Sequence, residues 1–146
     1  MMKRLLLISL IGAALTASTA YARDDRLKFP IQDGLNSPAA QGKIDAGVHL
    51  FWGDQKFPTP TQTFGTYTAN KKTNALNKSD KESCDINFVS AIISLQDRAH
   101  SQGGNAVVNI HSVYKNEDVS SDTTYDCGAG TFLSGVALRG TVVKLP

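Results

Sequence analysis

The two cysteines, Cys84 and Cys127, are the feature that most constrains how this chain of 146 residues folds. The N-terminal stretch predicts export from the cytosol, where thiols are kept reduced. Outside the cytosol, two lone cysteines on an ordered domain normally form one disulfide. That bond would bring two distant segments of the chain together, and it removes both thiols from the candidate nucleophiles.

The first 22 residues have the three parts of a secretory leader. A basic start at residues 3–4 precedes an apolar run over residues 5–15, and Ala20-Tyr21-Ala22 matches the small-x-small pattern of a cleavage site. The apolar run is too short to span a bilayer as a permanent helix. We therefore expect a signal peptide over residues 1–22 and a periplasmic or secreted mature protein, with a retained anchor as the alternative.

The mature chain, residues 23–146, is long enough for one α+β domain and too short for two of ordinary size. The full chain has 15 basic and 13 acidic residues, and the leader removes two of the basic ones, so the mature chain is formally neutral. Neutrality argues against nucleic-acid binding. No apolar run after the leader is long enough for a membrane span, so we expect none in the mature chain.

Residues 79–102 carry the clearest local pattern, that of an amphipathic helix. Ser79 and Glu82 match a capping box, and Gly103 and Gly104 are typical helix stops. Residues at steps of three and four form an apolar stripe, which predicts a buried face: Cys84, Phe88, Ala91, Ile92, Leu95 and Ala99. Three more residues broaden this stripe, as suits a helix lying across a sheet: Ile86, Val89 and Ile93. The polar residues expected largely outside it are Asp85, Asn87, Asp97 and Arg98.

The rest of the chain has the composition of strands and connections. We predict strands at 48–52, 63–68, 105–114 and 134–145, with extended structure resuming at 123–127 before the last strand. We predict a frayed end at 23–28, a short helix capped by Ser37, a polar connection at 70–77, and a polar turn, loop or hairpin tip at 115–122. The order is β-β-α-β-β, which favours an α+β fold with a mostly antiparallel sheet and one helix packed on one face.

Both cysteines then have structural positions, Cys84 in the first helical turn and Cys127 in a strand. A redox or metal-binding pair is the alternative. Redox pairs usually lie two residues apart, and a structural zinc site needs four ligands. The sequence shows neither pattern, which favours a structural disulfide.

The sequence contains no complete catalytic or cofactor-binding motif. Residues 130–135 have the glycine spacing of a phosphate loop, but Val136 stands where the lysine is required. No Gly-x-Ser-x-Gly elbow or calcium-loop order is present. We expect no catalytic residues, no cofactor and no metal. The alternative is a small periplasmic hydrolase or metal-dependent enzyme using His49 or His111 with nearby acids.

Polar loops on a rigid scaffold often carry binding. The candidate partner-binding residues are therefore Lys71 and Lys72 in the predicted 70–77 connection, with Glu117 and Asp118 in the 115–122 segment. The expected partner is an envelope protein or a small ligand.

Residues 103–108, Gly-Gly-Asn-Ala-Val-Val, follow the predicted helix as a similar turn does in YbjQ/RcsF-like proteins. Residues 135–143 are similar to the closing strand of that group, and the resemblance covers about 79–145. It implies a related fold, a disulfide between Cys84 and Cys127, and a role in envelope stress sensing.

Nearly the whole mature chain also resembles a small family of exported bacterial proteins that often carry the label of an excinuclease ATPase. The sequence contains neither a nucleotide loop nor a set of zinc-finger cysteines, so we expect no ATPase activity. The segments that carry the resemblance are 27–31, 64–65, 70–75, 103–110 and 127–130.

Overall fold

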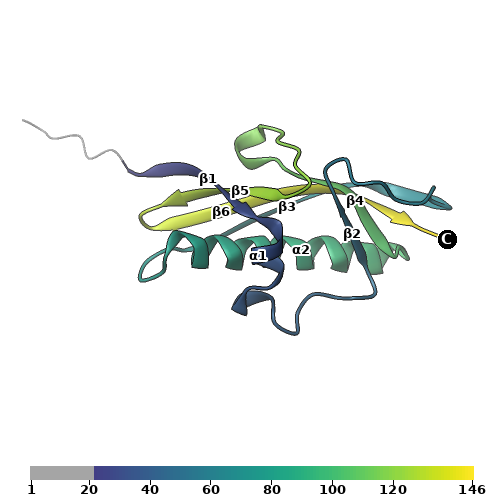
Figure 1. Cartoon of the computed structure of the whole chain (residues 1–146), viewed down its shortest axis with the longest axis horizontal. Helices are drawn as coiled ribbons and strands as arrows, with labels where there is room; N and C mark the ends of the chain where they lie inside the picture. Colours follow the sequence, from purple (N-terminus) through teal and green to yellow (C-terminus); the bar gives the residue numbers. More distant parts are fainter. Residues whose placement is uncertain (1–21) are drawn as a thin grey trace, which may run out of the picture.

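Residues 22–146, which the computed structural model describes, form a curled sheet of six strands with one long helix along one face (Figure 1). The expected leader lies outside these residues, apart from Ala22. The strands are β1 (Asp24–Pro30), β2 (His49–Trp52), β3 (Gln62–Asn74), β4 (Ala106–Ser112), β5 (Thr124–Gly130) and β6 (Leu133–Lys144). The helices are α1 (Ile31–Leu35) and α2 (Asp80–Gln102), with two 3₁₀ turns, η1 (Pro38–Ala40) and η2 (Tyr114–Asn116).

Strand β6 is the centre of the sheet. β3 pairs with one edge of β6 along its whole length, whereas β5 and β4 share the other edge. β1 then pairs antiparallel with β5, and β2 pairs parallel with β4. The predicted α+β class, with a mostly antiparallel sheet and one main helix on it, is confirmed.

The predicted frayed N-terminus is wrong, because residues 24–30 form strand β1. Every residue from Asp24 to Pro30 has a partner on β5. Its basic residues also have a specific role: Arg26 Nε lies 2.8 Å and Lys28 Nζ 2.7 Å from the carboxylate of Asp126, which is 1% exposed. This charged segment forms a strand because it pairs with β5, where Asp126, far away in sequence, contacts its two basic side chains.

The predicted connection at 70–77 is also wrong in its first part. β3 continues to Asn74, with Asn70 opposite Ala137 and Asn74 opposite Leu133. These polar residues have low strand propensity, but the neighbouring β6 satisfies their backbone groups.

Segment 115–122 is a loop and not a hairpin tip, since β6 lies between β4 and β5. A single bridge between Ser112 and Val119 and the short turn η2 order this loop.

Helix α2 confirms the local prediction at both ends. The Ser79 hydroxyl accepts a hydrogen bond from the Glu82 amide at 3.1 Å. At the other end Gly103 has a left-handed φ of 83°, which glycine adopts without strain. All six residues of the predicted stripe are buried, and Phe88 stacks between Tyr125 and Trp52, with ring centroids 4.1 and 5.5 Å away.

Two polar residues predicted to lie largely outside the stripe are buried. Asp85 is 6% exposed and Asn87 is 1% exposed. The curled sheet supplies their partners, since Asn87 Nδ2 donates to Ser134 Oγ at 2.7 Å and Asp85 accepts from Tyr125. Asp97 and Arg98 are exposed, as predicted.

Strand β4 departs from simple alternation. The register shifts between Val108 and His111, where Asn109 has a φ of 53°. As a result Ile110 packs in the main core beneath α2, whereas Val108 belongs to a second small cluster with Val143. In an unbroken strand at the predicted 105–114, Val108 and Ile110 would share a face, but a bulge inserts one extra residue between them and separates the two side chains. Among residues 22–146, no helix is long and apolar enough to cross a membrane.

Candidate functional site

A groove of about 890 Å³ lies between helix α2 and the segment that connects β1 to β2. One wall is the N-terminal half of α2 and the other is built from residues 33–43. The lining combines apolar and charged side chains: Asp33, Asn36, Ser37, Pro38, Ala39, Lys43, Ser79, Lys81, Glu82, Asp85, Ile86, Val89, Ser90 and Ile93.

The wall opposite α2 begins where Pro30 ends strand β1. The short helix α1 follows, and its Gly34 lies so close to Phe88 that a Cβ there would be 2.5 Å from the ring. The Ser37 hydroxyl donates to the Gly34 carbonyl at 2.7 Å, and Pro38 begins η1. The predicted helix start is thus only a 3₁₀ turn, and Ser37 does not cap it because its hydroxyl points back to α1.

Just beyond this wall, the chain at Asp45 and Val48 is hydrogen-bonded to the C-terminal half of α2. The Gln96 amide nitrogen donates to the carbonyls of Asp45 and Val48, at 2.9 and 3.1 Å, and its oxygen accepts from the Asp45 amide at 3.0 Å. The Asp45 carboxylate also contacts the His100 ring. This contact, and the Gly47 amide after it, lower the pKa of Asp45. Both ends of the wall are therefore held, so the groove is preformed.

The apolar part of the groove comes from one stripe of α2. Ile86, Val89 and Ile93 recur at steps of three and four, opposite Pro38 and Ala39. From Ser79 to Ile93 the helix rises about 21 Å, at 1.5 Å per residue. The sequence predicts that these three residues widen the apolar stripe and lie against the sheet. This expectation is only partly met, because Ile86 and Ile93 remain half-exposed.

The N-terminal end of the groove is charged. Lys81 Nζ lies 2.7 Å from Asp85 and 3.9 Å from Asp33. The hydroxyl of Tyr125 donates to Asp85 at 2.7 Å from below. Burial and this hydrogen bond both raise the pKa of Tyr125. With Glu82 included, this end of the groove has three carboxylates, those of Asp33, Glu82 and Asp85, and one amine, that of Lys81.

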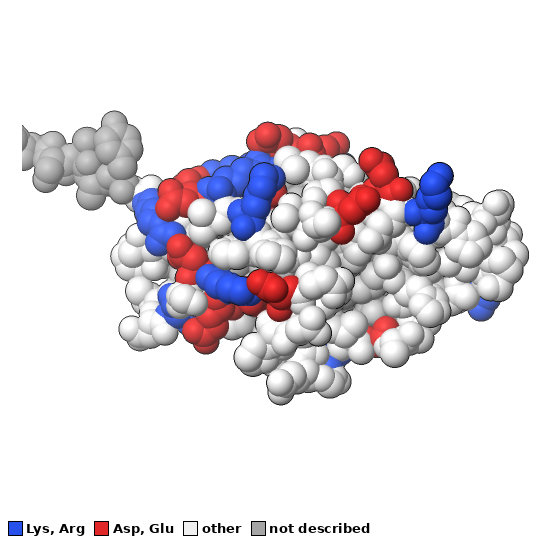
Figure 2. Space-filling view, in the orientation of Figure 1, with Lys and Arg blue, Asp and Glu red and all other residues white. Residues whose placement is uncertain are grey.

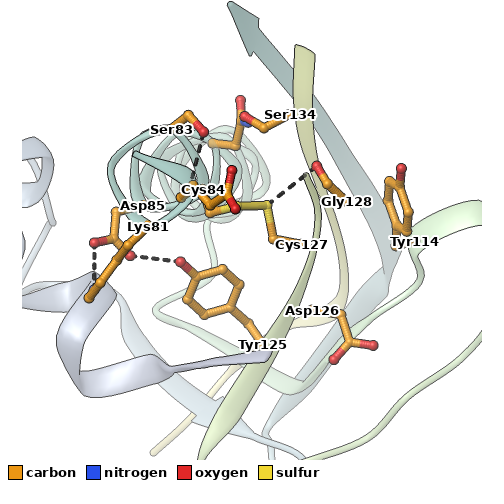
Figure 3. The surroundings of a disulfide bond; sticks show 12 residues. Lys81, Ser83, Cys84, Asp85, Tyr114, Tyr125, Asp126, Cys127, Gly128 and Ser134 are labelled. Atoms are coloured by element: carbon orange, nitrogen blue, oxygen red, sulfur yellow. Dashed lines mark hydrogen bonds and ion pairs between the residues drawn. A yellow bond between two sulfur atoms is a disulfide. The ribbon is translucent and has the colours of Figure 1, made fainter. Parts of the chain in front are cut away.

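The disulfide lies directly behind this charged end (Figure 3). It joins Cys84 in the first turn of α2 to Cys127 on β5, which confirms the predicted pairing. Figure 3 shows Tyr125 and Cys127 on the helix side of β5 and Asp126 on the opposite side. The bond therefore fixes the start of α2, and with it one wall of the groove, against the sheet.

None of the four predicted partner-binding residues lines the groove. Lys71 and Lys72 lie on strand β3 and not on a loop, so consecutive side chains point to opposite faces of the sheet. Glu117 and Asp118 do lie on the predicted loop, which covers the face of the sheet opposite α2 (Figure 1). Each is already in an ion pair, Glu117 with Arg26 at 2.6 Å and Asp118 with Arg139 at 3.5 Å.

The histidines do not converge. His49 is exposed on β2, where it pairs with the start of β4, whereas His111 lies five residues further along β4 and contacts Asp118 at 3.6 Å. Within residues 22–146, no three histidine, cysteine or acidic side chains are grouped so that they could hold a metal ion. The hydrolase alternative thus gains no supporting geometry from this part of the chain.

Comparison of the chain with protein-family models, with curated proteins and with solved structures finds no match.

Proposed function

We propose that this chain is an exported, disulfide-stabilised protein of the cell envelope that binds a partner through its groove and does not act as an enzyme. The disulfide between Cys84 and Cys127 is consistent with a location outside the cytosol. The observation that carries the proposal is the preformed groove beside α2, which combines an apolar stripe with a charged end.

The groove suits an extended peptide segment of a partner protein. Its length of about 21 Å corresponds to about six residues in extended conformation. Apolar side chains of the segment would contact Ile86, Val89 and Ile93. A basic side chain would lie at the end where Asp33, Glu82 and Asp85 outnumber Lys81.

The resemblance of residues 79–145 to YbjQ/RcsF-like proteins supports a role in envelope stress sensing. In that role the partner segment would be one that becomes accessible when envelope assembly fails. Binding in a preformed groove would then report the exposed segment without any chemical step.

Site-specific photocrosslinking in cells tests the groove. A photoreactive residue at Ala39, in the wall opposite α2, is expected to give a discrete crosslinked product that mass spectrometry identifies as an envelope protein. Ser90→Trp should fill the groove and abolish this product, because Ser90 lines the same space. Ser101→Trp, at an exposed position near the end of α2, is the matched control and should leave the product unchanged. A product that persists in the Ser90→Trp protein, or the absence of any specific product, would contradict the proposal.

A further inference from the structure

The exposed large apolar side chains of the described residues all lie at one end of the molecule. Phe132 is 64% exposed, Leu133 59% and Leu76 47%. We call these three residues the apolar tip. Turns usually carry polar residues and glycine, so three large apolar side chains at two turns are unusual for a free surface.

Two neighbouring turns build the apolar tip. Phe132 and Leu133 lie where the β5–β6 hairpin reverses, and Leu76 lies in the turn between β3 and α2. The Ala75 amide donates to the Phe132 carbonyl at 2.9 Å, and Asn74 pairs with Leu133. The backbone therefore holds the three side chains on adjacent turns.

Two lysines beside the apolar tip have no acidic partner among residues 22–146. In the part of the chain that the structure describes, Lys72 and Lys78 have no carboxylate within ion-pair distance. Glu82 lies further along and lines the groove. The other acids at this end have basic partners: Arg23 is shared by Asp25 and Asp80, and Lys115 pairs with Asp24. Figure 2 shows these mixed charges gathered at the end where the described chain begins.

The chain also enters the domain at this end (Figure 1). Asp24 pairs with Gly130, and a Cβ on Gly130 would lie 3.1 Å from the carbonyl oxygen of Arg23. The expected leader, whose apolar run is residues 5–15, would therefore join the domain at the same end as the apolar tip.

We propose that the apolar tip docks on a phospholipid surface that carries anionic headgroups. Phe132, Leu133 and Leu76 would enter the boundary between headgroups and acyl chains, and Lys72 and Lys78 would pair with headgroup phosphates. An aromatic ring flanked by leucines and lysines fits that boundary. The docking goes beyond the proposed function, because no residue of the apolar tip lines the groove, which stays open to a partner.

Fluorescence quenching by lipids with brominated acyl chains tests the docking directly. Phe132→Trp places an indole at the apolar tip, and Ser101→Trp places one near the other end of α2. The protein is recovered after export, and native Trp52, 4% exposed, serves as an internal reference. Anionic vesicles should quench the indole of Phe132→Trp strongly and leave that of Ser101→Trp unquenched.

Charge variants test whether Lys72 and Lys78 pair with headgroup phosphates. Lys72→Gln with Lys78→Gln should weaken vesicle binding about 25-fold, at about fivefold for each lysine near an anionic surface. Lys56→Gln with Lys144→Gln removes the same charge from exposed positions away from the apolar tip and should change binding less than twofold.

Three results would overturn the proposal. The first is the absence of quenching for Phe132→Trp. The second is equal quenching by anionic and zwitterionic vesicles, which would remove the role of the lysines. The third is a blue shift of the new indole that depends on protein concentration without vesicles, which would assign the apolar tip to self-association.

Discussion

The hydroxyl of Tyr125 on β5 donates a hydrogen bond of 2.7 Å to Oδ1 of Asp85 on α2. Asp85 follows Cys84, and Tyr125 lies two residues before Cys127, so a hydrogen bond and a disulfide join the same two elements side by side (Figure 3). The hydrogen bond satisfies a carboxylate that is 6% exposed at the charged end of the groove. The disulfide holds the helix start where the carboxylate can reach both Tyr125 and Lys81.

Tyr125→Phe should lower the free energy of unfolding by about 2 kcal/mol, because it removes a hydrogen bond to a buried charged group. The ring itself stays, so its stacking on Phe88 is kept. Urea unfolding followed by circular dichroism measures the change. Tyr67→Phe, at a half-buried position on β3, is the matched control and should change stability by less than about 0.5 kcal/mol. Equal losses in both proteins would contradict the role given to the Tyr125 hydroxyl.

The same hydroxyl predicts a specific loss of stability at alkaline pH. Burial and the bond to Asp85 raise the pKa of Tyr125 above its ordinary value of about 10. Above pH of about 10 the unfolded chain releases this proton and the folded chain retains it. Stability is therefore lost as pH rises, by up to about 1.4 kcal/mol per pH unit. The difference in free energy of unfolding between wild type and Tyr125→Phe should therefore shrink between pH 9 and 11. A constant difference over that range would show that Tyr125 titrates alike in both states.

Removing the disulfide with Cys84→Ala and Cys127→Ala should lower the free energy of unfolding by about 4 kcal/mol, on a chain-entropy model. The reason is that the bond closes a loop with a sequence separation of 43 in the unfolded chain. Urea unfolding in the presence and absence of a reductant provides the measurement. Reductant should destabilise the wild type and leave the double variant unchanged, and an effect on both would point to a cause other than this bond.

Gly34→Ala should lower stability by about 2 kcal/mol, because its new methyl group would overlap the buried ring of Phe88. Shifting the ring would also disturb the wall of the groove. A double-mutant cycle with Phe88→Leu supplies the control, since the smaller side chain makes room for the methyl group. If Gly34→Ala is as destabilising in the Phe88→Leu background as in the wild type, the overlap is not the cause.

The success of the prediction for α2 has a local cause. The cap at Ser79, the stop at Gly103 and the apolar stripe all depend on residues within a few positions of one another. The burial of Asp85 and Asn87 could not be predicted in this way. Their partners, Tyr125 and Ser134, are far away in sequence.

The strands show the same division. β2 and β6 were predicted because their residues favour strands, whereas β1 and the second half of β3 are strands only because β5 and β6 lie beside them. The sequence likewise contains no clear pattern that predicts the bulge at Asn109. The bulge reverses the face on which the next residues of β4 lie.

For the candidate site, the sequence contained a partial signal. Ile86, Val89 and Ile93 extended the apolar stripe beyond what one sheet contact needs, yet the opposite wall from residues 33–43 had no recognisable pattern. Loop composition instead pointed to Lys71, Lys72, Glu117 and Asp118, which lie elsewhere. Composition identifies polar segments, but it does not show whether they form a strand, as at Lys71 and Lys72, or pair with distant charges, as Glu117 and Asp118 do.

The sequence by itself determined the α+β class, the main helix with its ends, and the pairing of Cys84 with Cys127, because short-range patterns and a count of two cysteines suffice for these. Only the tertiary structure decided that residues 24–30 join the sheet, that Asp85 is buried under Lys81 and Tyr125, and that a preformed groove runs beside α2. Each of these depends on atoms brought together from distant parts of the chain. Such contacts form only when the whole sheet curls around the helix.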